Sequence, residues 1–445
     1  MSALDTRTAE GIPFGPVPTG PTPGQAKSPR RLAGELIGTI ALIVALAVAT
    51  GHADLLIVVL SIIVIVMVHE LGHFLAAKRG GMKVTEYFVG FGPRLWSFRR
   101  GETEYGVKAL PLGGYVKIPG MTNLEEVDPA DEGRLYRDKP FHSRLLVAVA
   151  GSAMHFLMAF LLLIALFALV GVPNNSQIQI QGVSALGGRP GPAAVGGVQA
   201  GDVVVSIDGR PIGGNMDALT SAIQHHPGVP ITVVVDRDGR HKTLTVTPAN
   251  GRIHHEVGAT PPKGSAPYGV IGVSLGSPVE TAGLVHALSS AGAGFGNFVW
   301  ASVTGIGHLF TLFSPHGIAQ RFQQVTSAKA AQQAEANGTR PLSTVGVVQT
   351  ANDAIHAGLG EFLYFLVLIN IFFGIFNLFP MLPLDGGHVA IAVYEKIRTG
   401  RRKVMYHADV AKLMPFTWLF ILVIAILVVP ALLTDIFHPV ANPFG

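Results

Sequence analysis

The sequence predicts a polytopic α-helical membrane protein with four core transmembrane helices and a further N-terminal one. A membrane-associated β-hairpin region and an inserted extracytoplasmic α+β domain complete the predicted fold. Three observations support this prediction. Hydrophobic residues make up 49% of the 445 residues and charged residues only 13%, a composition typical of membrane proteins. Apolar runs long enough to cross a bilayer recur along the chain. One of them ends in His69-Glu70-Leu71-Gly72-His73.

The two histidines of this motif are four residues apart. On a helix both imidazoles therefore project from one face, one turn apart. This spacing suits two nitrogens that bind one zinc ion at about 2.0–2.1 Å. Glu70 lies beside them and can take a proton from zinc-bound water. The chain has no cysteine, so any metal must be held by His, Asp or Glu.

The flank of the motif argues against a chance match. Residues 55–68, LLIVVLSIIVIVMV, are apolar without a break, as in a membrane helix rather than an amphipathic one. Ionisable side chains are rare in membrane helices because burying them there is costly. Three of them at the end of such a helix indicate a functional site.

Basic residues set the expected topology. Residues 1–31 read as a disordered tail rich in Pro and Gly, and Lys27, Arg30 and Arg31 place it in the cytoplasm. Residues 32–50 are either a retained transmembrane helix or a signal segment. The helix at 55–77 then runs inward, so its motif lies nearer the cytoplasmic face.

The remaining predicted spans cross the membrane alternately outward and inward. The predicted elements are a membrane-associated β-loop at 84–120, a transmembrane helix at 145–171, the α+β domain at 172–250 with tight DGR turns, an extracytoplasmic and interfacial connector at 251–359, a transmembrane helix at 360–388 and a last one at 415–435. Within the connector, 285–313 is expected to lie as a helix at the outer interface, and 314–340 to be a polar connector. No basic run with interleaved aromatics points to nucleic acid.

Two further positions concern the metal site. Asp385 is expected at the same depth as the histidines and is the natural third ligand, because loose Pro- and Gly-rich backbone at that depth must line a cavity. A helix-cap role was the alternative, but NLFPMLPLDGG offers no clean helix start. His155 in the helix at 145–171 is expected to be a hydrogen-bonded packing residue rather than a ligand.

Alternating residues in YGVKAL and YVKI, with glycine pairs between them, predict short strands. The edge around Gly113, Gly114 and Tyr115 is either an ordinary cytoplasmic hairpin or a surface that pairs with an extended substrate peptide.

Taken together, HELGH and NLFPMLPLDGG resemble the two metal motifs of the site-2 protease family of intramembrane zinc metalloproteases. YGVKALPLGGYVKIPG resembles the β-loop of its bacterial anti-sigma-factor-processing branch, and GPAAVGGVQAGDVVVSIDGRPI looks like part of one PDZ domain. A departure is Gly151-Ser152-Ala153-Met154-His155, where that branch usually has GPxxN. The role of that Asn cannot therefore be carried over to His155.

The resemblance implies one Zn²⁺ per chain on His69, His73 and Asp385, with Glu70 as general base and Asn377 near the substrate. It also implies a single-pass membrane protein substrate, such as an anti-sigma factor, cut after an upstream site-1-type protease has trimmed it. The expected location is the bacterial cell membrane. The competing hypothesis is a non-enzymatic membrane adaptor with a PDZ domain and a structural zinc, which would have four protein ligands.

Overall fold

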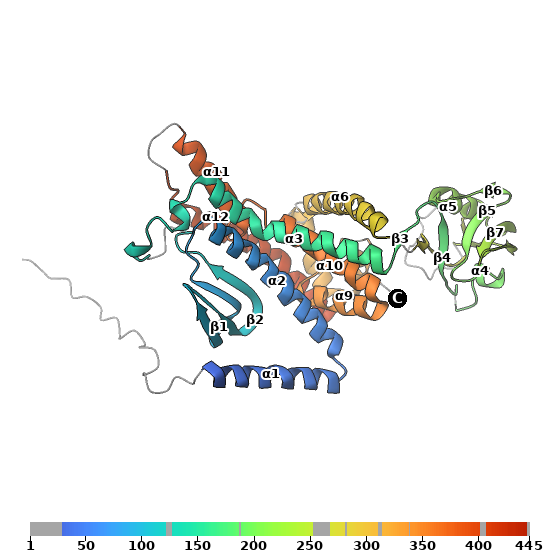
Figure 1. Ribbon diagram of the computed structural model, residues 1–445. Coiled ribbons are helices and arrows are strands. Elements are labelled where there is room, and N and C mark those ends of the chain that lie inside the picture. The colour runs from blue at the N-terminus through green and yellow to red at the C-terminus, as the bar shows by residue number, and fades with distance from the viewer. Residues whose placement is uncertain are drawn as a thin grey trace, which may run out of the picture. The chain divides into compact units, whose positions relative to one another are not determined.

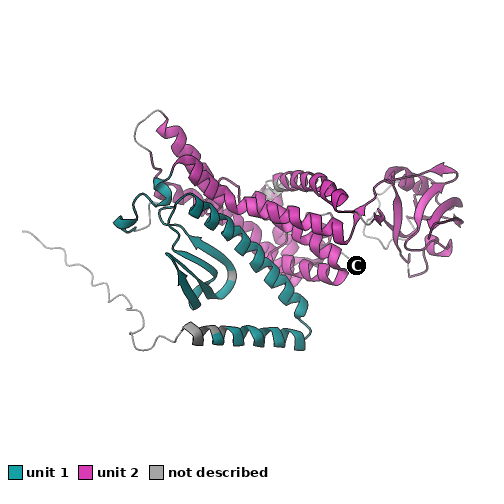
Figure 2. Ribbon diagram, viewed as in Figure 1, with its two compact units in different colours: residues 1–139 teal, residues 140–445 magenta. Residues whose placement is uncertain are grey.

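The computed structural model describes residues 29–121, 127–186, 188–251, 268–280, 283–309, 314–337, 339–400 and 406–442. The chain forms two compact units, residues 1–139 and 140–445 (Figure 2). Within the described ranges, four helices are long and apolar enough to cross a membrane, and they contain α2, α3, α10 and α12 (Figure 1). The predicted disordered tail lies outside the described residues up to position 28.

The first unit begins with helices α1 (Pro29–Ala49) and α2 (Ala53–Arg79). The apolar stretch of α1, Ile37–Ala49, is shorter than the four candidate spans. Both predicted readings of this segment, a transmembrane helix and a signal segment, therefore stay open. In α2, apolar residues cover every face up to the motif. Lys78 and Arg79 occupy its last turn, where cations interact favourably with the helix dipole.

Strands β1 (Glu86–Arg100) and β2 (Thr103–Lys117) follow, as predicted for 84–120. Both strands bend, so the first part of β1 is paired twice: Phe88 stands opposite both Gly106 and Tyr115. A Cβ on Gly106 would lie 2.6 Å from the Phe88 ring and 2.4 Å from the Trp96 carbonyl oxygen. Glycine is therefore required where the strands fold over one another. The short 3₁₀ turns η1 (Pro129–Asp131) and η2 (Tyr136–Asp138) end the unit.

The helices of the second unit pack around α3 (Phe141–Leu169), which contacts α6 (Leu284–Leu309) and α10 (Leu359–Phe376). Their shared core comprises Ala159, Leu163, Leu166, Ala291, Val367 and Ile371. Helix α6 is not among the four apolar spans. Its Phe295 packs edge-on against Phe156 and Phe160 of α3, so α6 is a packed part of this unit. Its position at the outer interface stays a prediction.

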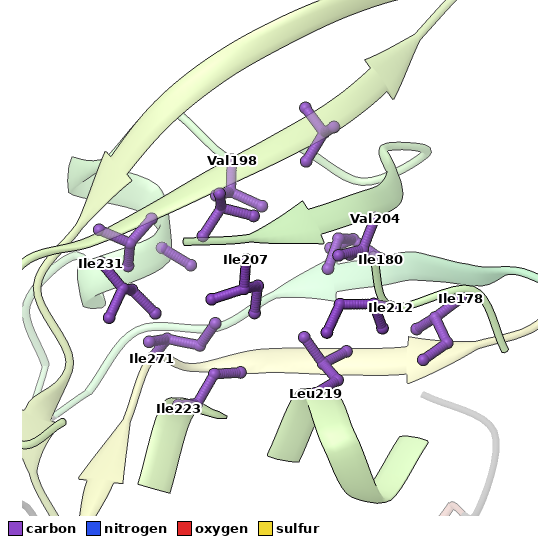
Figure 3. Packing of buried hydrophobic residues seen from close by; sticks show 14 residues of the cluster. Ile178, Ile180, Val198, Val204, Ile207, Ile212, Leu219, Ile223, Ile231 and Ile271 are labelled. Carbon is purple, nitrogen blue, oxygen red and sulfur yellow. The ribbon is translucent and has the colours of Figure 1, made fainter. Parts of the chain in front are cut away.

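An α+β domain is inserted between α3 and α6. Its sheet has the order β11-β4-β5-β7-β8, with β6 paired to β5. Its elements are β4 (Ile178–Val183), α4 (Pro192–Val195), β5 (Val203–Ile207), β6 (Arg210–Pro211), α5 (Met216–Gln224), β7 (Ile231–Arg237), β8 (Arg240–Val246), β9 (Ala249–Asn250), β10 (Gly269–Val270) and β11 (Val273–Gly276). The core is filled by isoleucines, valines, one leucine and one alanine from the strands, from α4 and α5 and from the segments between them (Figure 3).

The predicted end of this domain at 250 is wrong. Strand β11 pairs with β4, and Ile271 belongs to the core, so the domain continues to Gly276. The short strands β3 (Val172–Pro173) and β12 (Val279–Glu280) pair with each other and close the insertion. The predicted DGR turns are confirmed, since Asp208-Gly209 and Asp238-Gly239 all have positive φ.

The polar connector predicted at 314–340 is helical. The chain there forms α7 (Pro315–Thr326) and α8 (Ala328–Ala336), followed by α9 (Thr344–Ala357). Ser314, Ser327 and Ser343 each cap a helix by accepting from its first backbone amides. Arg340 then pairs with Glu335 and with the fully buried Asp435 of α12 (Met414–Phe437). Serine caps and the ion pairs of Arg340, rather than long apolar runs, stabilise this segment.

The predicted single helix over 360–388 is two helices. Helix α10 ends at Phe376, and α11 (Asp385–Thr399) begins at Asp385 itself. Contrary to the prediction, NLFPMLPLDGG therefore does contain a helix start, at Asp385. A loop of eight residues, 377–384, joins the two helices. After α11, η4 (Val410–Leu413) leads into α12.

Candidate metal site and its supports

The two histidines of the first unit are placed by α2. His69 and His73 are 8% and 6% exposed, and their Nε2 atoms lie 3.2 Å apart. Two nitrogens bound tetrahedrally to one zinc at 2.0–2.1 Å would be about 3.3 Å apart. The observed pair thus fits two corners of a zinc site without any change of backbone.

Glu70 is held beside this pair by the sheet. Its Oε2 accepts a hydrogen bond of 3.0 Å from the backbone amide of Val116 in β2. A Cβ on Gly114 would lie 2.6 Å from Sδ of Met67 and 3.6 Å from Cγ of Glu70. Glycine at 114 therefore lets the strand approach the helix at the motif. Of the three β-loop residues predicted to contact substrate, Gly114 lies directly against the HELGH motif.

The other two are engaged inside the sheet. Gly113 has φ of 149° and lies against the Phe91 ring. The Tyr115 ring stacks with those of Phe88 and Phe91, and its hydroxyl donates to Glu86. Burial and the hydrogen bond to the Glu86 carboxylate raise the pKa of Tyr115. This side chain therefore shapes the strand rather than standing free beside the motif.

A second tyrosine, which the sequence reasoning missed, fixes the sheet to α2. The Tyr87 hydroxyl donates to the Met67 carbonyl oxygen at 2.8 Å. Burial, followed by the negative charge of Glu70, raises the pKa of Tyr87 to about 12, so the phenol stays protonated and keeps donating. Its ring packs edge-on against Phe74. No signal in the sequence distinguished Tyr87 from any other strand tyrosine.

In the second unit the 377–384 loop and α11 place Asp385. The Gly386 amide donates to the Asn377 carbonyl at 2.7 Å, which brings the two predicted residues of this motif close together. A Cβ on Gly386 would lie 2.3 Å from the Leu378 carbonyl, and one on Gly387 would lie 2.6 Å from the Leu382 amide nitrogen. Both glycines are therefore required for the loop to fold over the start of α11.

A buried ion pair supports the same helix from behind. Arg144 of α3 donates to Glu395 of α11, and both side chains are about 5% exposed or less. The other Glu395 oxygen accepts from the Ala408 amide at 2.6 Å. No local pattern in the sequence indicates this pairing, because the two residues are 251 positions apart.

The prediction for His155 is confirmed. It is buried, and its Nδ1 lies 3.1 Å from the Asn370 side-chain oxygen on α10. Gly374 of α10 lies close by, because a Cβ there would be 3.2 Å from that of His155. A hydrogen bond between two buried side chains thus occupies the position where the anti-sigma-factor-processing branch usually has Asn.

The structure brings His69, Glu70 and His73 together with strand β2 in the first unit, and Asn377 together with Asp385 in the second. Among known proteins, the model of peptidase family M50 matches residues 57–424. Zinc metalloprotease Rip1 from Mycobacterium tuberculosis is 34% identical over 411 residues, which cover 86% of this chain and 96% of the relative. Rip1 from Mycolicibacterium smegmatis is 34% identical over 412 residues, with 86% and 97% covered.

Proposed function

Because the chain belongs to peptidase family M50 and is a zinc metalloprotease, we propose that it is an intramembrane endopeptidase that cuts single-pass membrane proteins. An anti-sigma factor is an example of such a substrate, and trimming by a site-1-type protease would precede the cut. The observation that carries the proposal is the pair of buried histidines with Glu70 in the second half of an apolar helix of 27 residues. Ionisable side chains within an apolar helix are costly in a membrane, so their presence there indicates a functional site inside the bilayer.

The proposed zinc ligands are His69, His73 and Asp385, one ion per chain. The spacing of the two Nε2 atoms supports the first two. For Asp385 the support is its fixed place at the start of α11, where the two glycines and the Asn377 carbonyl define the loop. Three protein ligands leave a position for water or substrate, as in catalytic rather than structural zinc sites.

When bound, the zinc ion supplies Lewis-acid chemistry at the scissile carbonyl. Glu70 takes the proton from the attacking water and hands it to the leaving amine. The Val116 amide keeps its carboxylate in place during both transfers. The edge of β2 near Gly114 pairs with the extended part of the substrate, because a helical peptide has no free amides to offer a protease. Asn377 contacts the substrate from the second unit.

The proposed topology puts the N-terminal tail and the motif end of α2 on the cytoplasmic side of a bacterial cell membrane. Lys78 and Arg79 at the end of α2, and Lys396 and Arg398 at the end of α11, support it. The inserted α+β domain, which resembles a PDZ domain, would then be extracytoplasmic.

The proposal is tested by reconstituting the purified protein into vesicles with a trimmed single-span substrate. Mass spectrometry of the products should place the cut within or at the edge of the apolar segment. Chelation should abolish the cut, and added Zn²⁺ should restore it. Cleavage only in a soluble part of the substrate would contradict the proposal.

A further inference from the structure

A cavity of about 560 Å³ lies in the second unit, where α3 ends and α10 begins. Its walls also include one side of α6 and residues of the paired strands β3 and β12, which close the inserted domain. Helix α10 runs from this cavity to the 377–384 loop that places Asp385. The cavity and the candidate metal ligand thus lie toward opposite ends of one helix.

The lining of this cavity carries a net negative charge. Among the described residues that form it, Glu361 in the first turn of α10 is the one charged residue. Glu361 is exposed, and no basic side chain in the described parts of the chain pairs with its carboxylate. A carboxylate in a first turn interacts favourably with the helix dipole, but its oxygens can still accept from a cation. The charge of the cavity therefore fits a cationic occupant.

Aromatic side chains share the lining with Glu361. The rings of Phe298 and Tyr364 pack edge-on with their centres 5.5 Å apart, and Phe167 lies in the same wall. Tyr364 follows Glu361 by three positions, so the two side chains are neighbours on α10. Aromatic faces attract cations. A carboxylate next to such rings suits a charge on an apolar stem, which is the form of a Lys or Arg side chain.

The length of α10 indicates which molecule carries this side chain. The helix has 18 residues, about 27 Å at 1.5 Å per residue, which is close to the apolar thickness of about 30 Å of a bilayer. A single-span substrate that is cut near Asp385 would therefore bring its outer flank to the depth of the cavity. This step rests on the proposed function.

We propose that the cavity binds a Lys or Arg side chain from the outer flank of the substrate's transmembrane segment, with its charge on Glu361. Basic residues are less frequent at the outer end of membrane spans than at the cytoplasmic end, so this contact selects among single-span proteins. A zwitterionic lipid fits the cavity less well, because it brings a phosphate together with its amine.

The experiment measures binding, so it does not depend on cleavage. The full-length Glu70→Gln variant in neutral detergent is mixed with a labelled synthetic peptide that contains the substrate span and one Lys at its outer flank. Fluorescence anisotropy gives Kd. We expect Kd to rise about fivefold when Gln replaces this Lys. A peptide with the same Lys moved to the inner flank keeps the net charge and should bind as weakly as the Gln peptide.

Variants of the cavity then test the role of Glu361. With Glu361→Gln added, the Lys and Gln peptides should bind equally. With Glu361→Lys, a peptide with Glu at the outer flank should bind better than the Lys peptide, a reversal that misfolding would not produce. Asp353→Asn is the matched control, because this carboxylate lies on α9 outside the cavity; it should leave the preference for Lys intact.

Three results would overturn the proposal: equal binding of the Lys and Gln peptides by the protein with intact Glu361, equal binding of the outer-flank and inner-flank Lys peptides, or an unchanged preference for Lys in Glu361→Gln. Product analysis with wild type separates this failure from that of the proposed function. Cleavage of both substrates with equal KM would refute the role of Glu361 alone. The absence of any cleavage with Zn²⁺ present would refute the proposed function itself.

Discussion

At the residue scale, the candidate metal site depends on side chains whose positions are fixed by the backbone that carries them. The histidine pair could be predicted from sequence, because a spacing of four residues on a helix fixes both rings on one face. What surrounds the pair could not. The Val116 amide reaches Glu70 from a strand 46 residues away, and Arg144 pairs with Glu395 across 251 residues. Such contacts are set by tertiary packing, which no local pattern encodes.

The proposed role of Asp385 as the third zinc ligand can be tested by substitution. Its change to Ala should remove most of the bound zinc, since two histidines alone hold the ion weakly and Ala offers no replacement oxygen. Metal content of the purified variant is the measurement. Asp353→Ala, which removes a carboxylate from α9 of the same unit, should keep full zinc. Full occupancy in Asp385→Ala would mean that the third ligand lies elsewhere.

At the element scale, apolar periodicity predicted the long helices well and the short polar ones poorly. Helices α2, α3 and α12 fall within a few residues of expectation. The boundary at Asp385 was missed because the first turn of α11 has no side-chain cap and is fixed instead by glycines packed under a loop. Helices α7–α9 were missed because serine caps and the contacts of Arg340 fix them, whereas the sequence of α7 and α8 reads as a polar connector.

The α+β domain offers an element-scale prediction on pH. Burial of Asp202 opposes its ionisation, but hydrogen bonds from Arg237 and from the Gln199 amide outweigh burial and lower its pKa. A lowered pKa in the folded state stabilises the fold above the ordinary carboxyl pKa of about 3.9, and this stabilisation is lost as the pH falls through the folded value. Asp202→Asn should therefore speed amide hydrogen exchange in β5 and β7 about tenfold or more at pH 7.

The same substitution should matter progressively less as the pH falls from the ordinary carboxyl pKa of about 3.9 toward the lower pKa of Asp202 in the folded protein. Hydrogen exchange by mass spectrometry on the full chain measures both conditions. Asp217→Asn, on α5 outside this pair, is the control. An effect that grows as the pH falls would show that the ion pair is not its cause.

At the scale of the whole molecule, the proposed topology determines which side of the membrane each helix end faces, and therefore the side on which the metal ligands lie. The absence of cysteine makes labelling direct. Single cysteines at Ser206 and Ser314 should react with an impermeant maleimide in intact cells, and one at Thr399 only after lysis. Labelling of the Thr399 variant from outside would overturn the proposed orientation of α11.

The other question at this scale is how the proposed protease would avoid cutting intact membrane proteins, and the inserted domain could provide the answer. We favour the hypothesis that the domain excludes substrates with bulky outer domains; recruitment of a trimmed C-terminus by strand addition is the alternative. Because Val279 pairs with Pro173, residues 174–278 can be removed and replaced by a short Gly/Ser bridge. Exclusion predicts that the deletion allows an untrimmed substrate to be cut. Slower cutting of trimmed substrate, with the untrimmed one still intact, would instead support recruitment.

The most direct test of the central claim is Glu70→Gln compared with wild type in vesicles that contain a trimmed single-span substrate. Gln keeps the shape and the hydrogen bond from Val116 but cannot act as a base, so zinc content should equal that of wild type. Cleavage should fall about 10²–10⁴-fold. Cleavage at near-wild-type rate by the zinc-loaded variant would contradict the assignment of Glu70, and with it the account of this site as a protease centre.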